Sequence, residues 1–218
     1  MSSRTRQLDA VEIRVLGALL EKEQTTPEAY PLTMNALLAA CNQKTNRDPV
    51  TSLTETEVDA AVERLRQEVL VWRVEGARVE RWKQSVSRRW SLDSGAKALL
   101  TLLLLRGPQT AGELHSRSER LHAFASLAEV EEALRRLAAA DEPLVREQPR
   151  RPGQKENRWI HLVGEIAERR EEEEEIAAVG AGPGAGPPRT SLAERVEQLE
   201  ATVARLAEEL AALVRELR

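Results

Sequence analysis

The sequence has few of the residues that build disulfides, metal sites or aromatic clusters. Its 218 residues include a single cysteine, Cys41, which excludes an intramolecular disulfide and a cysteine-rich zinc site. Cys41 lies in the apolar stretch LLAACN, so we expect a small buried thiol. Aromatic residues make up only 3% of the chain, which leaves core filling to Leu, Val and Ala. With 31% charged and 41% hydrophobic residues, the composition is typical of a soluble helical protein.

Long apolar segments are also missing. The opening residues, MSSRTRQLDAVEIRV, contain no apolar core of the signal-peptide type. The longest apolar run, residues 98–105, is interrupted by Thr101 and is far shorter than the ~20 residues that a bilayer requires. We therefore expect a cytoplasmic protein that makes no contact with a membrane.

The sequence shows no catalytic or metal-binding pattern. No nucleophile accompanies a base, and no Gly-rich phosphate loop is present. His115 and His122 are seven residues apart, two helical turns, so they cannot share a metal as a pair four residues apart can, and His161 is isolated. These absences predict a binding protein that is not an enzyme and needs neither a cofactor nor a metal.

What the sequence does contain is a repeat. Residues 54–65, TETEVDAAVERL, align with residues 126–137, SLAEVEEALRRL, at a constant offset of 72. Both segments open with the pattern [ST]-x-x-E, which predicts a capping box at the start of a helix. Both also carry apolar residues at intervals of three and four, which predicts one buried face. We interpret the two segments as copies of one small domain.

The repeat extends in both directions and predicts the fold. Upstream, PLTMNAL at 31–37 matches PQTAGEL at 108–114, where a Thr caps a short helix. Downstream, each copy has a segment expected to end in an Arg-Trp strand, at 89–90 and at 158–159. Three helices followed by a two-stranded ribbon form a winged helix-turn-helix. We therefore expect a mainly α protein with small β-ribbons (α+β), consisting of tandem winged helices at 1–92 and 93–164.

Three runs of residues resemble a known family. YPLTMNALLAACNQKTNRDPV, LLLLRGPQTAGELHSRSERLHAF and RRPGQKENRWIHL look like signatures of the YceH-like bacterial proteins, and the resemblance covers roughly residues 8–163. It implies a tandem winged-helix fold in a cytoplasmic protein. The family has no agreed biochemical function, so the resemblance implies no catalytic residues.

The distribution of charge bears on the ligand. The formal charge is −4, but residues 1–164 hold 25 basic and 23 acidic residues, whereas residues 165–218 hold 7 and 13. Residues 64–89 hold eight basic and three acidic residues, where the first wing is expected at roughly 69–92. Such clusters favour contact with DNA phosphates. The candidate DNA-binding residues are Arg64, Arg66, Arg78, Arg81, Lys83, Arg88, Arg89, Arg150, Arg151, Lys155 and Arg158.

Other features argue against sequence-specific recognition of DNA bases. The expected third helices begin with acids, Glu55 and Glu57 in one copy and Glu129 and Glu131 in the other, and carboxylates there would meet phosphate repulsion. The polar connection 42–53 has two cations, Lys44 and Arg47, which either touch phosphates or belong to a solvated loop. The three tryptophans of the first wing either stack on bases or pack the ribbon against the helices. The tip of the second wing looks like a phosphate-contacting turn, and a soluble turn explains it nearly as well.

The last fifty or so residues change character. Residues 165–190 combine an acidic run with a Gly/Pro-rich linker. Residues 191–218 then repeat apolar side chains in a heptad pattern that favours a parallel dimeric coiled coil. The dimerisation residues predicted on this basis are Leu192, Val196, Leu199, Val203, Leu206, Leu210, Leu213 and Leu217.

Two functions remain open on the sequence. The first is a dimeric DNA-binding protein, such as a transcriptional regulator, in which the wings contact double-stranded DNA phosphates and Arg64 and Arg66 provide weak base readout. The second is a protein–protein interaction module without DNA binding, for which the tandem winged-helix segregation and condensation protein B is an analogy at the level of fold only.

Overall fold

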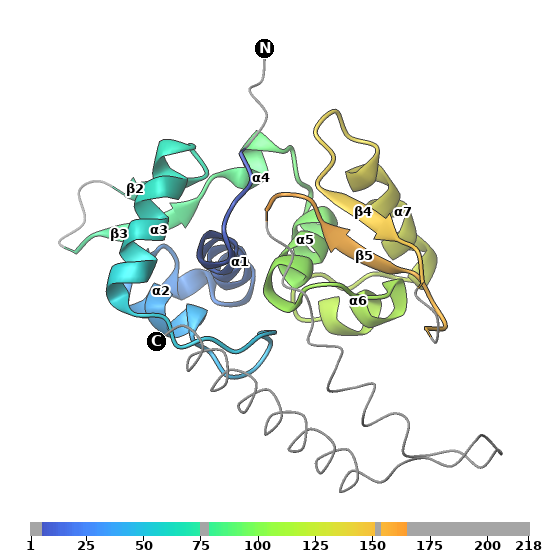
Figure 1. Ribbon diagram of the computed structural model, residues 1–218, viewed down its shortest axis with the longest axis horizontal. Coiled ribbons are helices and arrows are strands. Elements are labelled where there is room, and N and C mark those ends of the chain that lie inside the picture. The colour runs from blue at the N-terminus through green and yellow to red at the C-terminus, as the bar shows by residue number, and fades with distance from the viewer. Residues whose placement is uncertain (1–5, 75–78, 151–153, 165–218) are drawn as a thin grey trace, which may run out of the picture. The chain divides into compact units, whose positions relative to one another are not determined.

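The structure is a computed structural model, and it describes residues 6–74, 79–150 and 154–164. The protein is mainly α-helical with two small antiparallel sheets, as the sequence predicts (Figure 1). Residues 1–171 form one compact unit that contains both predicted copies. The coiled-coil segment 191–218 lies outside the described residues. No helix in the described part of the chain is long and apolar enough to cross a membrane.

The first copy contains three main helices and a three-stranded sheet. Its strands pair antiparallel in the order β1-β3-β2, with Leu32 opposite Trp82 and Val71 opposite Gln84. A short 3₁₀ helix precedes β1, and a short helix follows β3. The elements are α1 (Ala10–Thr25), η1 (Pro27–Ala29), β1 (Leu32–Thr33), α2 (Met34–Cys41), α3 (Glu55–Gln67), β2 (Val71–Val74), β3 (Arg81–Gln84) and α4 (Val86–Arg89).

The second copy repeats this order. A two-stranded ribbon follows three helices, with Val145 opposite His161 and Gln148 opposite Arg158. Gln109 pairs with Trp159 by an isolated bridge and thus takes the place that Leu32 of β1 has beside Trp82. The elements are α5 (Ser94–Arg106), α6 (Ala111–Ser118), α7 (Leu127–Ala138), β4 (Val145–Gln148) and β5 (Arg158–His161).

One predicted equivalence is wrong. The sequence interpretation matched Arg89 and Trp90 to the strand at Arg158, whereas Arg89 ends the helix α4 and the strand contains Arg81. The contacts identify the true pair, because Arg81 donates to the carbonyl of Pro31 over 2.7 Å and Arg158 donates to that of Pro108 over 3.1 Å. The first ribbon therefore ends at Gln84, and residues 86–89 form the short helix α4.

Most helix starts follow the predicted capping pattern. Thr54 has a complete capping box: its hydroxyl accepts from the Glu57 amide, and the Glu57 carboxylate accepts from the Thr54 amide over 2.7 Å. Ser126 departs from it. Its hydroxyl accepts from the Glu129 amide, but the Glu129 carboxylate bonds the amide of Ala125 over 2.7 Å. The reciprocal half of the predicted box is therefore displaced by one residue.

The caps allow a test of the helix starts. Thr54→Ala and Ser126→Ala should each lower the free energy of unfolding by about 0.5–2 kcal/mol, because each hydroxyl satisfies an otherwise unbonded amide. Urea melts would measure the change. Ser52→Ala, at an exposed position two residues before the first cap, is the matched control and should change little. Two silent cap variants would contradict the helix starts.

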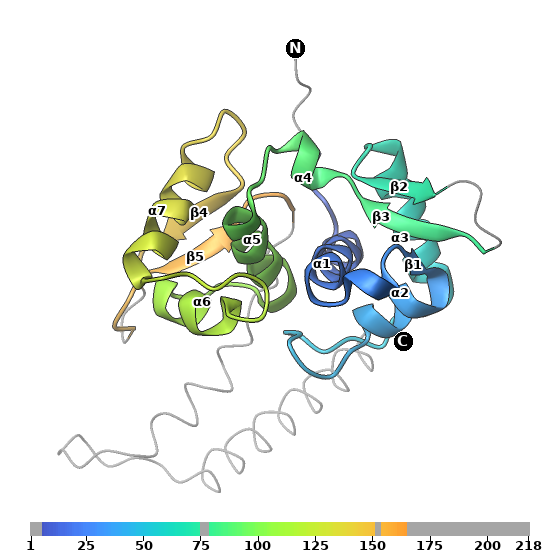
Figure 2. The same ribbon diagram turned by 180° about the vertical axis from the view of Figure 1, so that it is seen from behind.

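The helices α1 and α5 pack side by side at the centre of residues 1–171 (Figures 1 and 2). Gly17 permits the close approach, because a β-carbon at this position would lie 2.8 Å from Leu105 Cδ2. Helix α5 is buried on nearly every side, as its apolar sequence predicts, and it also contacts α6, α7 and β5. Cys41 is fully buried, which confirms the predicted buried thiol, and burial raises its pKa to about 12.

The ends of the compact unit are also joined. The amide of Leu8 donates to the carbonyl of Val163 over 3.0 Å, and Leu8 forms a parallel bridge with Gly164. A β-carbon on Gly164 would lie 2.2 Å from the Leu8 carbonyl oxygen, so this contact requires glycine. The N-terminal segment is thereby tied to the end of the second copy.

Candidate nucleic-acid interface

The arginines of helix α3 are held by carboxylates. Arg64 Nη2 lies 2.7 Å from Asp9 Oδ2, and its Nε lies 2.9 Å from Glu12 Oε1. Arg66 pairs with Glu63, three residues earlier on the same helix, at 2.9 Å. The cap of α1 thus lies against the last turns of α3, and the charges expected to read bases are largely neutralised. Their role in base readout stays a prediction.

Glu12 is the centre of this ionic cluster. It is fully buried and accepts hydrogen bonds from Arg6, Arg64 and the amide of Asp9. Burial on its own raises the pKa of Glu12, but the bonds from Arg6, Asp9 and Arg64 outweigh it and leave the pKa below its ordinary value. The carboxylate therefore remains ionised and holds the arginines in place.

Two ribbon arginines, and Arg89 at the end of α4, have structural contacts. Arg81 and Arg158 donate to the carbonyls of Pro31 and Pro108, and Arg158 also lies 3.1 Å from Glu113. Arg89 donates to the carbonyl of Glu68 over 3.3 Å. These side chains hold each ribbon against the segment that precedes α2 or α6, or against the end of α3. They are less available to phosphate than their sequence positions suggested.

The remaining described candidates are exposed and unpaired. Lys83 and Arg88 in the first copy, with Arg150 and Lys155 in the second, have no ion pair within the described part of the chain. Arg146, which the sequence analysis did not select, is also exposed and lies on β4. The sequence feature that could have identified Arg146 is its position in the short strand that precedes the basic turn. The candidates Arg78 and Arg151 lie outside the described residues.

An exposed tryptophan lies beside Lys83 in the first copy. Trp72 on β2 is 52% exposed and lies directly opposite Lys83 on β3, so an aromatic ring and a cation share the outer face of the ribbon. Trp82 is buried at 2% exposure and Trp90 is half-buried against the core. The packing interpretation therefore holds for two of the three tryptophans, while Trp72 is available to a ligand.

The outer faces of the third helices are acidic. Glu55, Glu57 and Asp59 are exposed on α3, and Glu129 and Glu131 are exposed on α7. Hydrogen bonds from the backbone amide and the hydroxyl of Thr54 lower the pKa of Glu57, so that this carboxylate is charged. Helix faces of this kind repel the phosphates that border a major groove.

The two cations of the connection between α2 and α3, residues 42–53, differ in their surroundings. Arg47 is 6% exposed and pairs with Glu21 through two hydrogen bonds of 3.0 and 2.6 Å. It also donates to the carbonyl of Ala40, so its guanidinium cannot reach phosphate. Lys44 remains exposed on the same connection.

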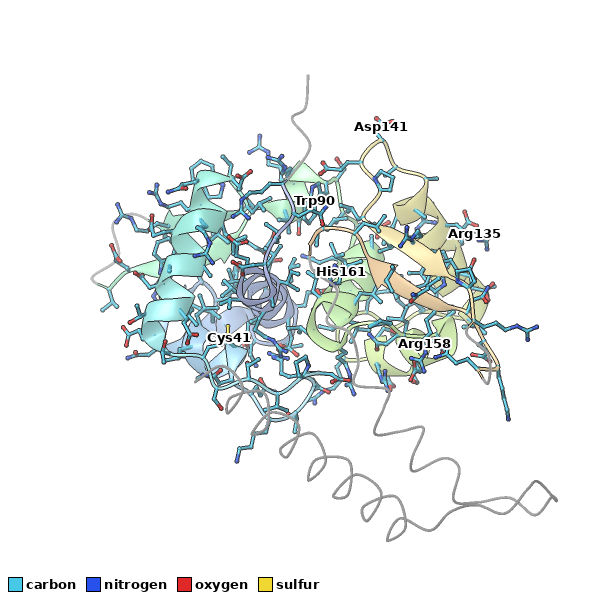
Figure 3. All side chains as sticks on the ribbon, in the orientation of Figure 1. Cys41, Trp90, Arg135, Asp141, Arg158 and His161 are labelled. Atoms are coloured by element: carbon cyan, nitrogen blue, oxygen red, sulfur yellow. The ribbon has the colours of Figure 1, made fainter. Side chains whose placement is uncertain are left out.

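One further set of polar residues could not be identified from the sequence. Arg14 on α1 is 4% exposed and His161 on β5 is 2% exposed, and both border one cavity. Figure 3 shows His161 at the end of β5 near α1 and α5, with Arg158 at the opposite end of the strand. The two residues are far apart in sequence, so no local pattern could have joined them. Within the described residues, no three His, Cys, Asp or Glu side chains form a group that could hold a metal ion.

The chain is an α+β protein in which a unit of three helices and a small antiparallel sheet occurs twice. A family described as "Protein of unknown function, DUF480" matches residues 8–154, and the chain belongs to this family. The resemblance to a bacterial family of this kind is thus confirmed, and the name YceH-like is compatible with it.

Relatives match along nearly the whole chain. A UPF0502 protein of Acidovorax sp. (strain JS42) is 45% identical over 224 residues, which cover 95% of this chain and 96% of that protein. A UPF0502 protein of Mesorhizobium japonicum is 46% identical over 207 residues, with 94% and 96% coverage. A UPF0502 protein of Dechloromonas aromatica (strain RCB) is 45% identical over 208 residues, with 94% and 95% coverage.

Proposed function

We propose that the protein is a non-enzymatic, winged-helix DNA-binding protein that contacts the phosphates of double-stranded DNA through its ribbons. The observation that carries the proposal is the distribution of ion pairs. Arginines of the third helices, such as Arg64 and Arg135, are paired with carboxylates, whereas Lys83, Arg88, Arg150 and Lys155 are not paired among the described residues. Cations without internal partners are those that can replace the counterions of DNA.

The proposal predicts binding with little sequence preference. Base readout requires side chains at the start of a helix in the major groove, and α3 and α7 present acids there. Trp72 beside Lys83 supplies a ring that can pack on a sugar or an unpaired base. A parallel coiled coil at 191–218 would double the number of ribbons and strengthen binding by linking two chains. A cytoplasmic location belongs to the same proposal.

Salt dependence tests the role of the first ribbon and of the helix α4 that follows it, which carry Lys83 and Arg88 respectively. In the full chain, Lys83→Ala combined with Arg88→Ala should flatten the slope of log affinity against log salt by about 2, since each phosphate contact contributes about −0.9. Fluorescence anisotropy of a random labelled duplex measures the slope. The matched control is Lys44→Ala combined with Arg120→Ala, which removes two exposed cations outside the ribbons and should leave the slope unchanged.

The same experiment distinguishes DNA binding from the second candidate function, protein–protein interaction. A folded protein that fails to bind duplex DNA at low salt, or equal slopes for the two double variants, would overturn the ribbon proposal. The acidic outer faces of α3 and α7, with the exposed Trp72, would then favour a protein–protein interaction module. Exposed tryptophans often supply much of the binding energy in such interfaces.

A further inference from the structure

A small apolar cavity lies where the two copies meet. Its walls come from the start of α1, the connection 42–53, the end of α5 and the end of β5. Its volume is about 140 Å³, and most of its lining is apolar, including Val11, Ile13, Leu53 and Leu104. All of these elements belong to the compact unit 1–171.

Two buried polar side chains border this cavity. Arg14 Nη2 donates to the carbonyl of Pro49, but its Nη1 is buried without a hydrogen-bond partner among the described residues. The Nδ1 of His161 is likewise buried without a partner within that part of the chain. A buried polar group left unbonded costs free energy, so two such groups at one apolar cavity suggest a ligand that completes their bonding.

We propose that this cavity binds a small aliphatic monocarboxylate, whose oxygens accept hydrogen bonds from Arg14 Nη1 and from His161 Nδ1–H. This site is separate from the ribbons and does not depend on DNA binding. Both nitrogens can donate, which calls for an acceptor, and a guanidinium bonds a carboxylate about twice as strongly as a neutral acceptor. The apolar walls call for a hydrocarbon body on the same molecule.

The charges around Arg14 are compatible with an added anion. Burial lowers the pKa of Arg14, and the nearby Arg47 lowers it further by more than Asp48 raises it. Asp48 borders the cavity and is half-buried, so it limits the ligand to a single negative charge. Burial also lowers the pKa of His161 to about 4, which makes the ring neutral at pH 7 and able to hold its proton on Nδ1.

The volume limits the size of the ligand. An apolar cavity of about 150 Å³ holds a molecule of the size of benzene, with six non-hydrogen atoms. Isobutyrate has about this size and carries both the charge and the branched hydrocarbon that the lining requires. A molecule of this kind would touch α1 of the first copy and β5 of the second, and would thereby link the two copies.

Isobutyrate and its neutral isostere methyl isopropyl ketone are suitable probes. Ligand-observed NMR on the full chain should show saturable binding of isobutyrate in the millimolar range, with weaker binding of the ketone. The nitrogen chemical shifts of the His161 ring should move with the same dissociation constant. Arg14→Met should weaken isobutyrate binding at least tenfold, because it removes one charge-assisted hydrogen bond. It should weaken binding of the ketone less.

Two further variants keep the proposal testable if Arg14→Met disturbs folding. Ala10→Met places a longer side chain at the border of the cavity. The position is exposed and methionine is a good helix former, so the fold should tolerate the change. The variant should weaken the binding of both probes. Lys44→Met removes an exposed cation of the 42–53 connection and should bind isobutyrate as the wild type does. The proposal is overturned by an absence of saturable binding up to about 50 mM isobutyrate, by equal binding to the Ala10→Met protein, or by a ketone that binds as well as the acid.

Discussion

Arg47→Met should lower the free energy of unfolding by about 3–5 kcal/mol, the range found when one partner of a buried ion pair is removed. The Arg47 side chain is fully buried and bonds Glu21 through both terminal nitrogens. It also donates to the carbonyl of Ala40, and so joins the 42–53 connection to both α1 and α2. Methionine fills part of the space but leaves the Glu21 carboxylate without its main counterion.

Urea unfolding of three variants distinguishes the loss of the buried ion pair from the loss of a positive charge alone. Lys44→Met removes the same charge from an exposed position of the same connection and should be nearly neutral. Combining Arg47→Met with Glu21→Leu should recover part of the loss, because the second change removes the unpaired buried carboxylate. Equal midpoints for Arg47→Met and Lys44→Met would show that the buried pair does not hold the connection.

The helical part of the fold was predictable because its signals are local. The caps at Asp9, Thr54 and Asp93, and the apolar spacing that follows them, lie within single turns of each helix. The same holds for the burial of Val58, which shares its helix face with three other apolar residues. Such patterns depend on the geometry of a single helix and need no knowledge of tertiary contacts.

The ribbons were harder to place because four-residue strands carry little local signal. The dipeptide Arg-Trp occurs at 81–82 and at 89–90, and either can be aligned with 158–159. The choice is made by pairing with β2 and with β1, and β1 comes from a segment about fifty residues earlier in the chain. This pairing leaves no signal within a single segment of the sequence, which explains the misplaced end of the first ribbon.

The candidate interface was predictable only as a set of charges. Which cations are free depends on partners distant in sequence, as when Arg64 bonds Asp9 across 55 positions. The cavity beside Arg14 and His161 depends on four separate segments and leaves no motif in the sequence. The acidic starts of α3 and α7, by contrast, could be predicted from the sequence, because the position of a residue within its helix is enough to place it.

Acidification from pH 7 to pH 4 should destabilise the protein by about 3 kcal/mol through His161 alone. Its pKa is lowered to about 4 by burial, against an ordinary value of 6.5, and each unit of difference corresponds to about 1.4 kcal/mol. Because the unfolded chain takes up the proton first, stability is unaffected above pH 6.5 and is lost as the pH falls from 6.5 toward 4. The charged residues that border the same cavity as this ring are Arg14 and Asp48.

Urea midpoints measured at intervals between pH 7.5 and pH 4.5 would reveal this loss, and His161→Leu should remove it, whatever the variant does to stability at pH 7. Glu12 adds a separate loss at lower pH: its pKa lies below the ordinary 4.5, so its contribution persists above 4.5 and disappears as the pH falls through the lowered value. The interval from 6.5 to 4.5 therefore reports on histidine. His122→Leu, which alters a half-buried histidine that does not border the cavity, is the matched control and should keep the slope of the wild type. If His161→Leu also keeps that slope, the buried neutral ring is not the source of the acid sensitivity.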